Sequence, residues 1–488
     1  MKYIKISIVI LLVSFISIFA YKLTTNNSNN KISLTKEQMK EMLSYTIDGN
    51  STSSMPTKGS GYKVKSITCK SGSILSWDND NWLLEVEKLE SEDLCNIDFT
   101  TGTGSYTVTA VPSIAGSLDS TSKTTTENGT VTFYTDAIID SVSGCTNEIS
   151  DGKVIVKNVT SNTTCNINVS YMKLYDKLLA DKSTRLTRTD FSTVLTNDNT
   201  KTLYTSTENG TTVYYFAGNA TDNWVKFGKN ASNQDLYWRI IRTNSDGSVR
   251  LLYHGTSTTA TDAYIGISAF NSSYDNIAYV SYMYGSLGSI SSARENTNNS
   301  TIKTTIDNWY ISNLEAKGYT KYLSTTAVYC NDRSISSDSI NFGAFTRLGT
   351  NKTPSYDCAA TEDKFTVDTS TGNGKLTYPI ALMTADEVSF AGGLYGANTP
   401  TWYYYNSVNG SSTGSKFWWL LSPLDSSTSG SSMFIVRGSS NPGRLNYNYV
   451  YSNNGVRPAL SLKSCVKYSS GDGSANEPYT IKETETGC

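Results

Sequence analysis

The eight cysteines of this 488-residue chain constrain its fold more than any other feature. They fall into four groups of two, and the members of each group lie close together in the sequence. This clustering predicts four local disulfides: Cys69–Cys95, Cys145–Cys165, Cys330–Cys358 and Cys465–Cys488. No group has CxxC spacing, which argues against zinc or thioredoxin-like chemistry. Structural disulfides form in oxidising compartments, so we expect the chain to act outside the cytoplasm.

The N-terminal segment agrees with export. In residues 1–23, Lys2 and Lys5 precede an apolar run from Ile6 to Ala20. This pattern predicts either a signal peptide cleaved after Ala20 or an uncleaved membrane anchor, although the run is short for a spanning helix. We therefore expect an extracellular or cell-surface protein that contacts the membrane only if this segment is retained.

Composition narrows the classes of fold and partner. Only 17% of residues are charged, while Tyr (33) and Gly (35) are abundant, which favours β-rich domains with uncharged polar surfaces. The net charge of −2 does not indicate the basic surface that nucleic-acid binding requires. A single histidine, His254, argues against a multi-histidine metal site, and no cofactor is expected.

The chain is too long for one core, and its patterns divide it into segments. A near repeat, Cys95-Asn-Ile-Asp-Phe99 and Cys165-Asn-Ile-Asn-Val169, predicts two small β modules, each with a disulfide between its first and last strands. The second module is expected to be Ig-like. The predicted segments are 24–61, a polar spacer with a short helix over 33–47; 62–101, the first module; 102–171, the second; 172–200, a connecting helix and linker; and 201–488, an α+β domain.

Local signals within the large domain are clear. Asp246-Gly247 predicts a hairpin turn between strands over 236–242 and 248–253. Helices are expected over 301–316, ended by Gly318, and over 385–391, with Thr384 as the N-cap.

Several segments of this domain carry a family resemblance. They include Tyr237-Trp-Arg-Ile-Ile-Arg242, Trp418-Trp-Leu-Leu-Ser-Pro423 and Val456-Arg-Pro-Ala-Leu-Ser-Leu462. Residues 200–480 resemble DUF6273-type exported proteins of low-GC Gram-positive bacteria. The resemblance implies a C-type-lectin-like fold, shared with formylglycine-generating enzymes and retroelement variable proteins.

The sequence departs from two branches of that group. The only near match to a calcium-binding EPN motif is Glu477-Pro478-Tyr479 in the tail, so calcium-dependent sugar binding is not implied. Formylglycine-generating activity needs reactive cysteines, whereas every cysteine here has a predicted partner. An enzyme of that class remains an alternative hypothesis, as does a purely structural envelope protein.

No catalytic set emerges from the sequence. Ser300 and Lys303 fit an SxxK pattern, but its companion motifs are absent. His254 lies at a strand end, without a nucleophile motif. Asp386 and Glu387 are adjacent on a predicted helix, so their side chains point in different directions.

Binding residues are better supported, because flat aromatic faces and amide groups suit noncatalytic recognition of a glycan or protein ligand. Tyr447, Tyr449 and Tyr451 alternate with Asn and Val, so they fall on one face of a strand. The same pattern also fits a solvated sheet face without a ligand. We place the framework at Phe417–Pro423 and Val456–Leu462, and the binding surface between them. The candidate ligand-binding residues are Trp402, Tyr403, Tyr404, Tyr405, Trp419, Arg437, Asn441, Arg444, Asn446, Tyr447, Tyr449, Tyr451 and Asn453.

Overall fold

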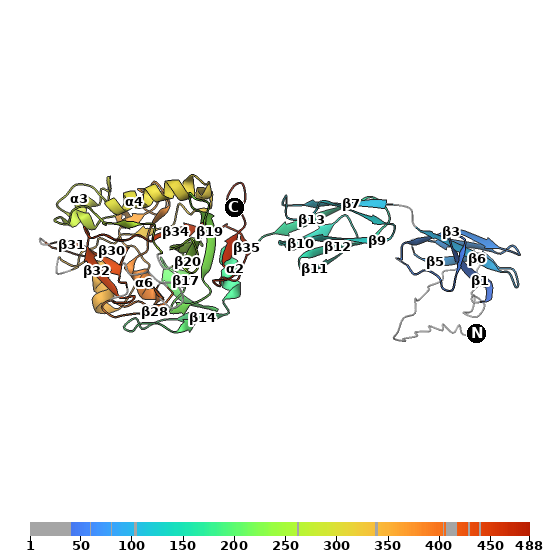
Figure 1. Ribbon diagram of the computed structural model, residues 1–488, viewed down its shortest axis with the longest axis horizontal. Helices are drawn as coiled ribbons and strands as arrows, with labels where there is room; N and C mark the ends of the chain where they lie inside the picture. The colour runs from blue at the N-terminus through green and yellow to red at the C-terminus, as the bar shows by residue number, and fades with distance from the viewer. Residues whose placement is uncertain are drawn as a thin grey trace, which may run out of the picture. The chain divides into compact units, whose positions relative to one another are not determined.

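The computed structural model describes residues 41–58, 60–79, 81–101, 105–260, 263–336, 340–403, 405–406, 417–427, 430–438 and 441–488 (Figure 1). The chain forms two compact units, Met1–Ser170 and Tyr171–Cys488. Both are β-rich. The predicted signal peptide or anchor and residues 24–40 and 59 of the spacer lie outside the described residues, as do Tyr404 and the side chain of Tyr405.

The first β module pairs its first strand with its last. One sheet has the order β2-β1-β6-β3, and β4 and β5 form a separate hairpin (Figure 1). Ile97 and Phe99 on β6 are fully buried and pack with Trp82. The strands are β1 (Leu43–Ile47), β2 (Asn50–Thr52), β3 (Tyr62–Cys69), β4 (Ile74–Asp78), β5 (Leu83–Lys88) and β6 (Cys95–Thr101).

The helix predicted over 33–47 is wrong at its C-terminal end. Leu43–Ile47 is strand β1, which runs parallel to Cys95–Phe99 of β6. A further strand, β2, lies in the predicted polar spacer at Asn50–Thr52. The sequence of this segment predicted a helix, but pairing with a strand some fifty residues away decides the conformation, since tertiary context overrides weak local propensity.

The second module repeats this connectivity. Its sheets have the orders β10-β13-β7-β8 and β11-β12-β9, and the first strand, β7, again runs parallel to the last, β13. The predicted internal repeat is therefore visible in the strand pairing. The strands are β7 (Ser105–Pro112), β8 (Ser122–Thr126), β9 (Gly129–Tyr134), β10 (Ile138–Ser143), β11 (Asn147–Ser150), β12 (Lys153–Val159) and β13 (Thr163–Ser170).

All four predicted disulfides are present, with the predicted partners. Their place in the modules differs from the prediction. Cys69 ends the third strand, β3, and lies directly opposite Cys95 at the start of β6, while Cys145 follows β10. The first strands, β1 and β7, contain no cysteine. The first module's disulfide therefore links a middle strand to the last strand, and the second module's links the bend after a middle strand to the last strand.

The second unit is built on a large mixed sheet. Its order is β14-β16-β17-β20-β19-β36-β35, and β21, β34 and β27 extend it from β20. The strands are β14 (Thr184–Thr187), β16 (Thr202–Glu208), β17 (Thr211–Tyr215), β19 (Trp224–Lys229), β20 (Asp235–Thr243), β21 (Val249–Gly255), β27 (Ile380–Leu382), β34 (Pro458–Leu462), β35 (Tyr468–Ser470) and β36 (Tyr479–Ile481). The predicted Asp246-Gly247 turn joins β20 to β21, with Gly247 at a φ of 77°.

A five-stranded sheet of order β22-β33-β30-β31-β32 carries the candidate surface (Figure 1). Its strands are β22 (Ile267–Ser268), β30 (Trp418–Ser427), β31 (Gly430–Val436), β32 (Leu445–Tyr449) and β33 (Asn454–Gly455). The smaller pairs are β15 (Asp198–Asn199) with β18 (Asn219–Ala220), β23 (Met283–Tyr284) with β24 (Asn298–Asn299), β25 (Tyr329–Cys330) with β26 (Lys364–Phe365), and β28 (Thr401–Trp402) with β29 (Tyr405–Asn406).

Helices of this unit start and stop largely as predicted. Thr384 caps α6 in a capping box with Glu387, and Gly318 has the left-handed conformation that follows the end of the 301–316 helical stretch. The connecting helix ends at Asp181, where the polar stretch of the predicted linker begins. The helices are α2 (Leu174–Asp181), η1 (Ile277–Val280), α3 (Ile290–Ala293), α4 (Thr301–Tyr310), η2 (Ile311–Glu315), η3 (Tyr319–Tyr322), α5 (Gly343–Phe345), η4 (Thr346–Asn351), η5 (Thr361–Asp363) and α6 (Ala385–Ala391).

Candidate functional site

Four tyrosines form an exposed group at one end of the five-stranded sheet, which we call the tyrosine surface. Tyr274, Tyr447, Tyr449 and Tyr451 are 43%, 38%, 44% and 48% exposed. The rings of Tyr449 and Tyr451 stack, with centroids 5.8 Å apart and an interplanar angle of 14°. Tyr274 lies 4.7 Å from Tyr451. Large side chains exposed together in this way typically mark an interaction site.

The local backbone explains why these rings lie together. β32 is the last strand in its sheet, and Tyr447 and Tyr449 share a face because side chains alternate along a strand. Gly430 on β31 leaves room for the Tyr449 ring: a Cβ at that position would lie 2.8 Å from Cε1 of Tyr449. The absence of a side chain at Gly430 therefore lets the Tyr449 ring lie close to the neighbouring strand.

A carboxylate lies in the same row of the sheet. Asp425 on β30 pairs with Ser432 on β31, and Ser432 pairs with Tyr449 on β32. Residues paired in this way project from the same face. Burial raises the pKa of Asp425, and the Ser432 hydroxyl offsets only part of that effect. Asp425 is therefore a partly desolvated carboxyl beside the tyrosine surface.

Three of the predicted binding residues are misplaced. Trp402 and Trp419 are fully buried and Tyr403 is 1% exposed, so all three belong to the core. The indole nitrogen of Trp419 donates to the Ser268 carbonyl at 2.8 Å. An aromatic-rich sequence does not reveal which rings other elements will cover.

The remaining predicted residues that the structure describes lie on β32 or in the segments before and after it. The side chain of Asn446 accepts a hydrogen bond from the Tyr447 backbone amide, and that of Asn448, which was not a candidate, accepts one from the Tyr449 amide. The Arg444 guanidinium donates to Asn398. Arg437 lies over the Phe417 ring, Asn441 is half-buried and Asn453 is exposed.

The sequence prediction missed Tyr274, and it did not name Asp425 as a candidate residue although Asp425 lies within the stretch predicted to form the binding surface. Tyr274 stands in a polar loop, Asn271-Ser-Ser-Tyr-Asp-Asn276, far from β32 in the sequence. Asp425 lies just after the framework segment Phe417–Pro423, and no sequence motif around it indicates a binding residue. Only the three-dimensional pairing brings them beside Tyr449 and Tyr451.

A second group of polar side chains lies in the core. Oε1 of Glu387 accepts from Arg242 Nε at 3.0 Å and from Arg250 Nη1 at 2.7 Å, and Arg242 also donates to Glu208 at 2.8 Å. Burial raises the pKa of Glu387, but the Arg250 and Arg242 guanidiniums outweigh it and hold the pKa below its usual range. Burial also raises the pKa of Glu208, but the Arg242 guanidinium, with smaller effects from the Ser245 amide and Arg250, outweighs it and lowers the pKa to about 2.

This charged network is structural. Arg347 extends it by pairing with both oxygens of Asp386. Glu387, Arg242 and Arg250 are at most 3% exposed. The cavity that Arg347 and its neighbours line measures about 20 Å³, room for about one water molecule and too small for a substrate.

The catalytic candidates have structural places as well. Ser300 is the N-cap of α4: its hydroxyl accepts from the Lys303 amide and donates to the Tyr282 carbonyl. Lys303 pairs with Asp307 at 2.6 Å. His254 is buried, 4.5 Å edge-to-face from the Trp224 ring. All eight cysteines are in disulfides, which leaves no reactive thiol for formylglycine-generating chemistry.

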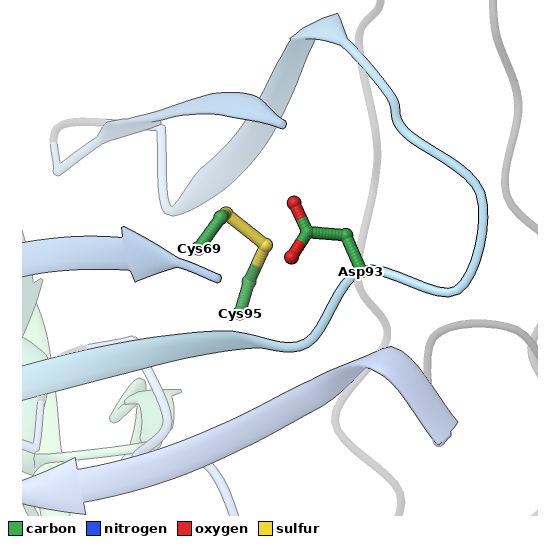
Figure 2. Close-up of side chains that lie close together, drawn as sticks. All are labelled: Cys69, Asp93 and Cys95. Carbon is green, nitrogen blue, oxygen red and sulfur yellow. A yellow bond between two sulfur atoms is a disulfide. The ribbon is translucent and has the colours of Figure 1, made fainter. Parts of the chain in front are cut away.

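Within the described residues, one group of side chains has metal-ligand spacing, Cys69, Asp93 and Cys95 (Figure 2). The two sulfurs are bonded to each other, and the Asp93 oxygens accept the Ser71 and Ser73 amides at 2.5 and 2.8 Å. Burial raises the pKa of Asp93, but hydrogen bonds from Ser73 and Ser71 outweigh it and lower the pKa to about 2. The carboxylate therefore holds the 71–73 loop beside the disulfide.

Comparisons with protein-family models, curated proteins and solved structures found no match. Across the described part of the chain, no helix has the length and apolar character needed to span a membrane.

Proposed function

We propose that this chain is an exported cell-surface protein that recognises a glycan or protein ligand noncatalytically. In this proposal the Tyr171–Cys488 unit is C-type-lectin-like and follows two small disulfide-containing β modules in the chain, the second of them Ig-like. The tyrosine surface is the observation that supports recognition most directly. Four disulfides, including one in each β module, suit the oxidising environment outside the cell.

The physical basis is a preorganised aromatic platform. Tyr449 and Tyr451 stack on each other, and Tyr274 packs against Tyr451, so little side-chain freedom is left to lose on binding. Tyrosine offers a flat apolar face with a hydroxyl at its edge, which suits both sugar rings and peptide side chains.

Ligand screening with matched variants tests the proposal. The full exported chain is screened on a glycan array and in bait pull-downs. We expect Tyr449→Ala and Tyr451→Ala each to weaken binding by about tenfold, the loss typical of a central aromatic contact. Tyr134→Ala removes an exposed tyrosine from the first unit and serves as the control. Retained binding in the Tyr449 and Tyr451 variants would show that the ligand site lies elsewhere.

A further inference from the structure

Among the residues that the structure describes in the second unit, burial raises the pKa of two carboxyls, Asp307 and Asp425. Asp307 lies 2.6 Å from the Lys303 ammonium. Asp425 forms no salt bridge with any residue that the structure describes. A partly desolvated carboxylate without a cation is costly, and a cationic ligand group would offset that cost.

The sheet register places this carboxylate within reach of the rings. Asp425 and Tyr449 lie on one face, two strands apart, with only the small, buried Ser432 between them. Neighbouring strands are about 4.8 Å apart, so the two backbones are about 10 Å apart. Tyr395 and Tyr447 also lie in this region: burial raises the pKa of Tyr395, and the nearby Tyr447 and Asp425 raise it further.

The stacked tyrosine rings and the Asp425 carboxylate require different chemical groups on one ligand. Stacked tyrosine rings accept the apolar face of a sugar ring, whereas an ionised Asp425 only accepts hydrogen bonds and attracts positive charge. Tyrosine faces also attract cations. A sugar that carries a free amino group satisfies both requirements, while a neutral sugar leaves the carboxylate without a cation.

We infer that the tyrosine surface binds a glycan whose residues carry free amino groups, with an ammonium at Asp425 and a sugar ring on Tyr449 and Tyr451. This inference rests on the proposed recognition function. Beyond that function, it specifies that the ligand is positively charged and that Asp425 is the residue that selects for this charge.

The test uses two oligosaccharides with the same sugar backbone, a β-1,4-linked glucosamine oligomer with free ammonium groups and its N-acetylated counterpart with neutral amides, each titrated against the full chain. We expect the amino form to bind more tightly, and Asp425→Asn to weaken it by about fivefold, the size of an exposed ion pair, without changing the acetylated form. Asp176→Asn, which removes an exposed carboxylate from α2, is the charge-matched control and should change neither.

Three results would overturn the inference while leaving the proposed function intact. The first is equal binding of both oligomers that is lost in Tyr449→Ala, which would indicate stacking without charge selection. The second is competition by polylysine as strong as that by the amino glycan, which would indicate a peptide ligand. Failure of both oligomers to bind, with another ligand lost in Tyr449→Ala, would also reject the amino-glycan assignment.

Discussion

Replacing Glu387 should destabilise the Tyr171–Cys488 unit strongly. Its Oε1 accepts one hydrogen bond from each of two arginines, and Oε2 accepts the Thr384 amide at 2.9 Å. In Glu387→Ala, Arg242 retains its ion pair with Glu208, but Arg250 loses its only carboxylate partner in the described network. Because the Arg250 side chain is only 1% exposed, water cannot replace that partner. Breaking a buried ion pair from one side costs about 3–5 kcal/mol, and most of that cost should come from Arg250.

Denaturant unfolding followed by tryptophan fluorescence measures this loss, because six of the eight tryptophans belong to this unit. Glu315→Gln, at an exposed position in the same unit, is the control and should change the free energy of unfolding by less than about 0.5 kcal/mol. Adding Arg250→Met to Glu387→Ala should recover part of the loss, since it removes the unpaired buried charge.

Two outcomes would refute this reasoning. A loss in Glu387→Ala no larger than in Glu315→Gln would show that the buried network contributes nothing measurable. A double variant with Arg250→Met that is less stable than Glu387→Ala alone would show that the loss comes from packing or the helix cap and not from an unpaired Arg250.

Three further predictions concern other parts of the chain. Gly430→Ala should displace the Tyr449 ring and reduce ligand binding in titrations while leaving the circular dichroism spectrum unchanged; unchanged binding would show that the ring's position does not matter. Replacing Cys145 and Cys165 by Ser removes a crosslink between residues 20 apart in sequence and should cost about 3 kcal/mol, measured by denaturant unfolding. Glu208 has a folded pKa of about 2, below its unfolded value of about 4.3, so its stabilisation is present above that value. It should be lost as the pH falls from about 4 toward 2, and a pH titration of stability showing no loss there would contradict the pairing.

Local patterns in the sequence were enough to predict the disulfides and several helix ends. Each cysteine pair is separated by only 20 to 28 residues and closes within one module or loop. Capping by Thr384 and termination by Gly318 depend on a few neighbouring residues. That Tyr447 and Tyr449 share a face of the strand followed from alternation alone, whereas their exposure did not.

The errors arose where distant residues decide the outcome. Leu43–Ile47 becomes a strand because β6 pairs with it. Trp419 is fully buried, and its indole nitrogen donates to the backbone carbonyl of Ser268, about 150 residues earlier in the chain. Asp425 joins the candidate site only through the register of β30, β31 and β32. Composition and periodicity contain no signal for such pairings.

The charged core and the tyrosine surface are connected through the framework. Glu387 fixes α6 against Arg242 of β20 and Arg250 of β21. The helix is in turn tied to β30, because the Ala385 amide donates to the Ser422 hydroxyl at 3.0 Å, and α6 also lies against β32. Since packed interiors transmit displacement, the Tyr449 platform should be only as rigid as this network. Binding that weakens in Glu387→Gln under conditions where the variant is still folded would therefore indicate loss of preorganisation, because Glu387 itself is buried away from any ligand.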